Sequence, residues 1–564
     1  MDDEDDYKPH DWKPSERPAL PGAPSNPDHH PVKRVAYFIV GLIVALTGAL
    51  GNALVTANIV NLQGTFGAYA SEMQWLTGAY VMTIVSMNLL LVKFRQQYGL
   101  RAFTLVFLVL YALVTFAHLF AHNLPAAIAV RAVSGMVGAA VTVLGLYYTL
   151  QAFPAAHRPK GIVCGLGFSQ LALPLARTFS SHLLAQGEWR GLIWFEFGMA
   201  LVALACVLAL QLPPGDRIKT FEKMDFLTFG LFAPGVALLC AVLAMGRVDW
   251  WLDTAWLGWA LCGAVVLVLA ALAIESNRAR PLLNIGWLTS VRIAKLASAV
   301  LLIRIVLSES TGAVGFLQAL GLHTDQMQTL FGVVLLGSVA GLVASALTIK
   351  PTNLTYSLMA ALLCMAAGAW IDAGATSDTR PVNMYLSQFL LAFGGTFFMG
   401  PTLLSGISAV LPDPRNLISF TVMFSITQNM GGLLGSAIVG TFQVAREKYH
   451  SSYLVEHLTL LDPQVAARVA ASAGGYAKVL ADPTIRNAEG LAALATAATR
   501  QANVLAYNDE FMLIAAVAIA TLAWLLVSEI WMRCTHPGPL PATTNATQSH
   551  AVLAQIPLTN SDPR

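Results

Sequence analysis

Charge is scarce in this sequence. Only 11% of the 564 residues are Asp, Glu, Lys or Arg, whereas 56% are hydrophobic, and the mean hydropathy is +0.63. A soluble chain of this length needs a charged surface, so the composition excludes a soluble multidomain protein and indicates an integral membrane protein. The net charge of +2 is nearly neutral and gives no support for nucleic acid as a partner.

The residue patterns of several chemistries are also missing. The sequence has no Gly-Lys dipeptide, hence no P-loop, and no His-Glu-x-x-His zinc motif. Its six cysteines form no Cys-x-x-Cys pair and lie in or near apolar runs, as small buried residues do. His118 and His122 are four residues apart but have no third metal ligand nearby in sequence. We therefore expect no enzyme activity, no catalytic residue, no metal site and no cofactor.

Long apolar runs are what the sequence does contain. About 20 apolar residues in a helix cross the roughly 30 Å of hydrocarbon in a bilayer. The polar residues 1–33, which are acidic and Pro-rich, and 534–564 predict disordered tails on either side of these runs. Fourteen transmembrane helices are predicted between the tails, at residues 35–61, 71–91, 102–121, 124–153, 161–185, 191–212, 226–245, 254–274, 293–322, 327–349, 354–371, 382–411, 416–442 and 511–532.

The distribution of Lys and Arg predicts the orientation of the chain. An even number of spans places both tails on one side of the membrane, and short cytoplasmic loops are rich in Lys and Arg. The short loops after odd-numbered spans hold three such residues: Arg190, Arg247 and Arg380. Those after even-numbered spans hold fourteen: Lys93, Arg95, Arg101, Arg158, Lys160, Arg217, Lys219, Lys223, Arg278, Arg280, Arg292, Lys295, Lys350 and Arg415. Both termini are therefore predicted to be cytoplasmic.

One connection, residues 443–508, is much longer than the others and lies on the external side in this topology. It is rich in Ala, with helix breakers at Pro463, at Gly474 and Gly475, and at Pro483. We expect two or three short helices over the outer mouth of the bundle. They form either a solvated cap or a docking surface for a partner subunit.

Five ionisable residues fall inside the spans, where a charge is costly unless it faces a cavity or a partner. They are Glu196, Glu309, Arg131, Arg177 and Arg304. Three of them belong to the N-terminal part of the chain: Arg131, Arg177 and Glu196. They lie at similar depths in their spans, so we expect their side chains to form one layer across the bundle. Arg304 and Glu309 are separated by about 140° around a helix and should not pair. Two interpretations stay open: a fixed Arg131–Glu196 ion pair, or contact of at least one of the five with substrate or protons.

Several short runs occur near span ends in a characteristic order. They are Asn58-Ile59-Val60-Asn61, residues 74–80 (QWLTGAY), Arg131 with Gly135, Trp189-Arg190, residues 316–321 (FLQALG) and residues 501–511 (QANVLAYNDEF). Together these runs resemble the motifs of the fourteen-span drug:proton antiporter family of the major facilitator superfamily, the multidrug-export permease type. The resemblance covers roughly residues 35–532.

The sequence departs from the family pattern at three places. Thr56 stands where the first-span motif usually has Asp, and Gln96 replaces an Asp in the loop motif built around Gly99. Arg177 stands where the motif of span five has a proline. With three positive residues inside the spans, these departures favour organic acids or amphipathic toxic compounds with an anionic group over cationic dyes.

The resemblance implies an all-α major facilitator fold with a 6+2+6 arrangement. An N-terminal six-helix half would span residues 34–212, two inserted helices residues 213–275, and a C-terminal half residues 276–533, including the external loop 443–508. The protein would be a proton-driven exporter without a cofactor, its halves rocking around a midplane site. An uptake permease of the same fold for an organic anion is the alternative.

The resemblance and the buried charges together give candidate site residues. Glu309 is the first candidate for proton coupling and Glu196 the second, because a carboxyl group shielded from water can change its charge. The candidates for the substrate path are Arg131, Arg177, Arg304, Gln318, Asn61, Trp75 and Tyr80. The candidates for a cytoplasmic gate loop are Lys93, Arg95, Gln96, Gly99 and Arg101.

The expected partners are a small-molecule substrate, protons and the lipid bilayer, in a bacterial inner membrane. Related permeases work with a periplasmic adaptor protein and an outer-membrane channel. The resemblance implies that such a partner would dock on the external segment 443–508.

Overall fold

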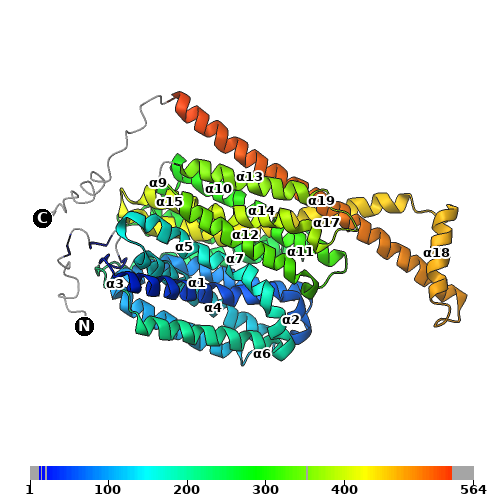
Figure 1. Ribbon diagram of the computed structural model, residues 1–564, viewed down its shortest axis with the longest axis horizontal. Helices are drawn as coiled ribbons and strands as arrows, with labels where there is room; N and C mark the ends of the chain where they lie inside the picture. Colours follow the sequence, from blue (N-terminus) through cyan, green and yellow to red (C-terminus); the bar gives the residue numbers. More distant parts are fainter. Residues whose placement is uncertain (1–11, 14–15, 19–21, 351–352, 536–564) are drawn as a thin grey trace.

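The structure is a computed structural model that describes residues 12–13, 16–18, 22–350 and 353–535. These residues form a bundle of aligned α-helices, and strands are absent from the described ranges (Figure 1). Helix α1 begins and helix α19 ends at the left of Figure 1, which we call the inner end; it corresponds to the predicted cytoplasmic side. The opposite end, from which an arm projects, is called the outer end.

The N-terminal half has its own hydrophobic core and is built from six helices and one short turn. They are α1 (Pro31–Ala57), α2 (Ile59–Phe66), α3 (Ala70–His118), α4 (Leu124–Ala152), η2 (Ala155–His157), α5 (Arg158–Gln170) and α6 (Ala172–Ala209).

Two of these helices contain a reversal of the chain. In α3, Gly99 has non-helical angles (φ 80°, ψ 166°), and the Phe94 and Phe107 rings lie only 5.4 Å apart. Thirteen residues of continuous helix would separate them by about 20 Å. In α6, Gly191 lies against the carbonyl oxygen of Leu183, which also requires the chain to turn back. The two arms of α3 are therefore the predicted second and third spans, and α5 with α6 supplies the fifth and sixth.

The inserted helices are α7 (Lys223–Met245) and α8 (Ala255–Ser276). They pack against each other, and α7 also packs along α3. The remaining elements form the C-terminal half with a second core. They are α9 (Ile285–Leu288), α10 (Val291–Val306), α11 (Glu309–Ala319), η3 (Thr324–Met327), α12 (Gln328–Thr348), α13 (Leu354–Asp372), η4 (Pro381–Met384), α14 (Tyr385–Phe397), α15 (Met399–Val410), η5 (Pro414–Asn416), α16 (Leu417–Ser425), the π-helical turn η6 (Ile426–Met430), α17 (Gly431–Glu456), α18 (Pro463–Gly475) and α19 (Pro483–Thr535).

Twelve helices in the described residues are long and apolar enough to cross a membrane. The difference from fourteen has two causes. Helix α3 holds two predicted spans, and the predicted span 293–322 is divided at Leu307 and Ser308 into α10 and α11. Every predicted span thus has helix, while fourteen crossings and the cytoplasmic position of the termini stay predictions.

The outer segment differs from the predicted short helices over the mouth. Helices α17 and α19 continue past the bundle as a paired arm, with α18 at its tip (Figure 1). Helix α19 has 53 residues and is about 80 Å long, well beyond the hydrocarbon thickness. Asp509 of α19 binds Arg446 at 2.5 Å and His450 at 2.7 Å on α17. The prediction of short helices over the outer mouth is therefore wrong, because the Ala-rich run continues without interruption into the last apolar span.

The described part of the N-terminal tail also differs from the predicted disorder. Ser25 is buried at the inner end, where its carbonyl oxygen accepts a 2.9 Å hydrogen bond from Gln151 Nε2 and its N–H donates to the Pro214 carbonyl oxygen at 2.9 Å. Trp12 donates to Asp216 at 2.7 Å. Disorder is therefore wrong for residues 22–30, because their backbone finds partners on the bundle. Residues 1–11, 14–15, 19–21 and 536–564 of the predicted tails lie outside the described residues.

Candidate functional site

A polar cluster lies inside the N-terminal half and is centred on Arg131. The fully buried guanidinium donates to Asn52 Oδ1 at 2.6 Å and to the Gly51 carbonyl oxygen at 3.2 Å, and it lies 4.6 Å from the centre of the Tyr80 ring. Helix α1 supplies these two acceptors and α4 the arginine, while α3 supplies the ring and a third acceptor, the Leu76 carbonyl oxygen, 3.5 Å from Arg131 Nε. Two substrate-path candidates, Arg131 and Tyr80, are thus in contact.

Glu196 of α6 reaches the same place from another side. Its carboxylate lies against Gly51, and the Tyr111 hydroxyl is 3.1 Å from Glu196 Oε1 and 2.8 Å from the Thr47 carbonyl oxygen. Arg131 and Glu196 therefore share a layer, as predicted. A direct ion pair between them, one of the two interpretations left open by the sequence, is not among the ion pairs of the described residues. Each side chain is held by neutral partners instead.

A second cluster lies in the C-terminal half and contains two acidic side chains. Glu309 is 0% exposed, Asp372 3% and Gln388 3%. The amide nitrogen of Gln388 lies 2.9 Å from Glu309 Oε1 and 2.8 Å from Asp372 Oδ2, so one side chain of α14 joins α11 to α13. Glu510 of α19 lies against Gly312, one turn beyond Glu309. No Lys or Arg of the described chain forms an ion pair with Glu309 or Asp372.

The break between α10 and α11 positions Glu309. The helix ends at Val306, and Glu309 is the first residue of α11. Its second carboxylate oxygen, Oε2, is buried without a hydrogen-bond donor. The sequence reasoning placed Glu309 inside the span, but it did not select Asp372 or Gln388. The signal available was weak: Asp372 ends an apolar run, and Gln388 is a single amide within one.

Arg304 and Gln428 are two further buried polar residues of the C-terminal half, apart from the Glu309 cluster. Arg304 is on α10, and Gln428 is on the π-helical turn that precedes α17. Arg304 Nε and both polar atoms of the Gln428 side chain are buried without hydrogen-bond partners. As predicted, Arg304 does not pair with Glu309. Gln428 was missed by the sequence reasoning.

A cavity of about 730 Å³ lies between the two halves at the outer end. It contains the substrate-path candidates Asn61 and Gln318. The other lining residues come from both halves: Val60, Gly64, Thr65, Ser181, Leu184, Ala185, Gly321, Leu322, His323, Thr324 and Asp325. A larger cavity of about 1000 Å³ is lined only by residues of the N-terminal half. It therefore does not lie between the two halves.

Two further substrate-path candidates, Arg177 and Trp75, do not line the cavity between the halves. Arg177 lies 5.5 Å from the centre of the Phe331 ring on the opposite half, so it faces the C-terminal half rather than the cluster around Arg131. Trp75 stacks on Trp256 of α8, with ring centres 6.1 Å apart. The structure thus places Trp75 against the inserted helices rather than in the cavity between the halves.

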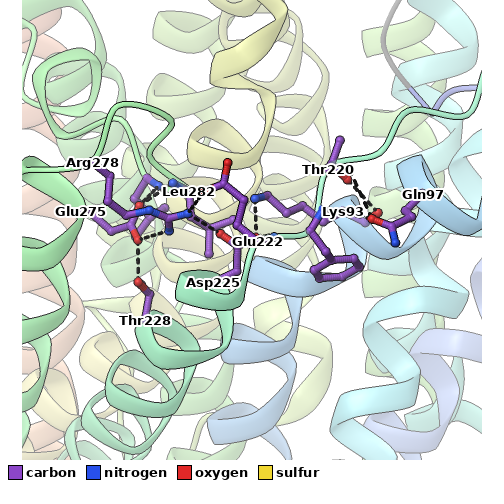
Figure 2. Close-up of polar contacts among 11 residues, drawn as sticks. Lys93, Gln97, Thr220, Glu222, Asp225, Thr228, Glu275, Arg278 and Leu282 are labelled. Atoms are coloured by element: carbon purple, nitrogen blue, oxygen red, sulfur yellow. Dashed lines mark hydrogen bonds and ion pairs between the residues drawn. The ribbon is translucent and has the colours of Figure 1, made fainter.

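The predicted gate loop is part of an ion-pair network at the inner end, shown in Figure 2. Lys93 binds Asp225 at 2.6 Å, and the other oxygen of Asp225 accepts from Arg278 at 2.9 Å. Arg278 also binds Glu275 at 2.7 Å, and Glu275 accepts hydrogen bonds from Thr228 and from the Leu282 N–H. The network joins α3 to both inserted helices and to the segment leading into the C-terminal half.

The other gate candidates lie around the Gly99 reversal. Gly99 has a positive φ, which a side chain would strain, and Arg217 lies against it. The Gln96 carbonyl oxygen accepts from the Ile218 N–H at 2.9 Å, and Arg95 lies 4.8 Å from the centre of the Tyr147 ring. Arg101 is exposed. The loop therefore contacts the linker after α6 as well as the inserted helices.

Two helical halves, with buried charges in each and a cavity between them, define a multi-pass membrane transport protein. The sequence model of the Major Facilitator Superfamily matches residues 38–438, and the chain belongs to this family. Its members are transporters rather than enzymes, which confirms the expectation that the protein is not an enzyme.

Curated relatives carry names of the same kind. The uncharacterized MFS-type transporter YhcA of Bacillus subtilis is 22% identical over 452 residues, which cover 77% of this chain and 80% of the relative. The efflux pump FUS6 of Gibberella fujikuroi is 23% identical over 450 residues, covering 73% and 76%. Multidrug resistance protein 3 of Bacillus subtilis is 20% identical over 421 residues, covering 72% and 79%.

Solved structures share the fold. The human organic anion transporter MFSD10 gives a TM-score of 0.52 at 13% identity, covering 87% of this chain and all of that one. The proton:xylose symporter XylE gives a TM-score of 0.51 at 14% identity, covering 86% and 95%. At these identities the likeness shows the fold alone.

Proposed function

We propose that the protein is a proton-coupled exporter of amphipathic toxic compounds or organic acids that works by alternating access, without a cofactor. The observation that carries this proposal is the buried set of Glu309, Gln388 and Asp372, which has no cationic partner in the described chain.

The protonation argument rests on charge and burial. Two carboxyl groups bound to one amide nitrogen in a hydrocarbon-embedded bundle cannot both be ionised without a cation, because each charge opposes the other and neither is hydrated. At least one proton is therefore held at Glu309 or Asp372. Rearrangement of the halves that admits water lets this proton leave, and the proton gradient then drives the cycle. Glu196 is the second candidate.

Export is favoured over uptake by the names of two relatives, an efflux pump and a multidrug resistance protein. Uptake of an organic anion stays the alternative, since the fold also occurs in a sugar symporter. The proposed location is the inner membrane of a bacterium.

The test uses purified protein in vesicles with an imposed proton gradient and two xanthene dyes, anionic fluorescein and cationic rhodamine 123. Gradient-driven accumulation of at least one dye is expected. Glu309→Gln and Asp372→Asn should each reduce it by about tenfold or more, whereas Asp253→Asn, at an exposed carboxylate between α7 and α8, should not. Undiminished gradient-driven transport in Glu309→Gln and Asp372→Asn would refute coupling at this pair.

The external arm is proposed to bind a periplasmic adaptor protein, which in turn engages an outer-membrane channel. The arm is suited to this because it extends far from the bundle and exposes large apolar side chains near its tip, such as Leu461 (91% exposed) and Val479 (82% exposed). Replacing residues 457–482 by a short Gly/Ser linker should abolish copurification of an adaptor identified by mass spectrometry, with dye transport in vesicles retained. Equal copurification with and without the tip would contradict the proposal.

A further inference from the structure

Arg304 and Gln428 lie at matching depths near the middle of the bundle. Arg304 is thirteen residues from the start of α10, and Gln428 is eleven residues from the start of α16, so both are roughly 16–20 Å from the inner end. The Arg304 guanidinium packs on the helix that carries Gln428: its Nη2 atom lies 3.0 Å from the position that a Cβ atom at Gly432 would occupy. Gly432 is one helical turn beyond Gln428, which places Gln428 on the face that Arg304 meets.

Both side chains lack partners. The described residues supply neither a carboxylate nor a hydrogen-bond acceptor for the Arg304 guanidinium, and its Nε atom is buried. Gln428 is only 8% exposed, yet neither its Nε2 nor its Oε1 atom has a hydrogen bond. A permanently charged guanidinium and an unsatisfied amide in this position are each costly, because buried polar groups normally find partners.

The local backbone is shaped to bring the guanidinium close. Gly431 and Gly432 follow the π-helical turn, and side chains there would crowd Arg304. Single π-helical turns inside α-helices are frequent at functional sites because they redirect side chains. Here the turn includes Gln428, so the glycines and the turn serve the same pair.

We propose that Arg304 and Gln428 form the subsite that binds the anionic group of a transported compound, a carboxylate or a sulfonate. The planar guanidinium offers parallel N–H donors that match such a group, and the Gln428 amide adds a further donor. This inference rests on the proposed transport function and gives it a substrate class.

The test measures dye binding to purified protein in detergent without any proton gradient, by fluorescence polarisation. Fluorescein should bind more tightly than rhodamine 123, which has the same ring system and the opposite charge. Arg304→Leu should weaken fluorescein binding by about tenfold or more and Gln428→Leu by several-fold, with little change for rhodamine 123. Asp253→Asn serves as the unaffected control.

A second variant separates binding from a structural role. Gln428→Glu places a carboxylate beside Arg304 and should abolish fluorescein binding while the melting temperature is retained or raised. If Gln428→Glu binds fluorescein as the wild type does, the inference is overturned. It is also overturned if the wild type transports rhodamine 123 on a proton gradient but does not bind fluorescein. Fluorescein binding that depends on Arg304, without gradient-driven transport, would refute the proposed function and leave the subsite standing.

Discussion

Arg131 shows how this chain holds a buried charge in the membrane without an acidic partner. Its guanidinium is held by Asn52, by the Gly51 carbonyl oxygen and by the face of Tyr80. These neutral partners, which come from two neighbouring helices, offset the cost of burying the charge, and they leave Glu196 free of a permanent ion pair. A carboxyl group not fixed by a cation can bind and release a proton, which a locked pair cannot do as readily.

The stability of this arrangement can be measured by removing the arginine. Arg131→Leu removes the hydrogen bonds to Asn52 and to the carbonyl oxygens of Gly51 and Leu76, together with the contact on the Tyr80 ring. We therefore expect a loss of about 2–4 kcal/mol and a clearly lower melting temperature in detergent. Arg101→Leu, at an exposed position of the predicted gate loop, should change the stability by less than about 0.5 kcal/mol. Equal melting temperatures for the two variants would contradict the buried role of Arg131.

At the scale of helices, the inserted helix α7 supplies the gate loop with an acidic partner that the loop's own sequence lacks. Gln96 stands where the family resemblance expects an Asp, and Asp225 of α7 supplies a carboxylate to Lys93 instead. Arg278 links the same carboxylate to α8 and the following segment. Burial opposes the charge of Arg278, but hydrogen bonds to Glu275, Glu222 and Asp225 raise its pKa above the ordinary value, so it stays charged at any physiological pH.

Neutralising Asp225 should loosen the inner end of these helices. Asp225 is 0% exposed, and Asp225→Asn leaves Lys93 and Arg278 without their shared partner, a change that costs about 3–5 kcal/mol for a buried pair. We expect faster hydrogen exchange at the inner ends of α3 and α7, measured by mass spectrometry. The companion variant Lys93→Met combined with Asp225→Asn should restore part of the protection, as a double-mutant cycle would show.

Glu222→Gln is the matched control for this change, since Glu222 binds Arg278 from a position that is 43% exposed. Its effect should be small because exposed ion pairs contribute little. Comparable exchange in Glu222→Gln and Asp225→Asn would mean that the network does not fasten α7 to α3.

The helices themselves were largely predictable, because a hydrocarbon layer demands apolar runs of a fixed length. The side-chain contacts between different helices were not predictable. Asp225 and Asp372 stand at span ends in the sequence, and nothing local indicates that one meets Lys93 and the other meets Gln388. Such pairs depend on how distant helices pack. The outer arm was missed for a different reason: helix propensity indicated helix, but it contains no information on whether that helix folds over the bundle or continues away from it.

On the scale of the whole molecule, the two halves touch at two depths. On the inner side of the middle, roughly 12 Å from the start of α16, Asn88 of α3 donates to Ser425 of α16 at 2.9 Å. At the outer end, Gln328 of α12 donates to Ser181 of α6 at 2.9 Å, beside the cavity of about 730 Å³. Alternating access requires each of these contacts to break in turn, because a solute can enter or leave only where the halves part.

A cross-link between the halves at the outer end should therefore stop the transport cycle. Ser181→Cys and Gln328→Cys would be combined in a background in which the exposed Cys262 and Cys534 are replaced by Ser, and joined with a short reversible bifunctional thiol reagent. Gradient-driven dye accumulation in vesicles should fall to the background level and return after reduction. A matched pair within the C-terminal half, Arg446→Cys with Asp509→Cys, whose native side chains are in contact and 33% and 29% exposed, should cross-link without blocking transport. Continued transport by fully cross-linked Ser181→Cys/Gln328→Cys protein would show that these outer surfaces do not separate, since the reagent holds α6 and α12 together through the whole cycle.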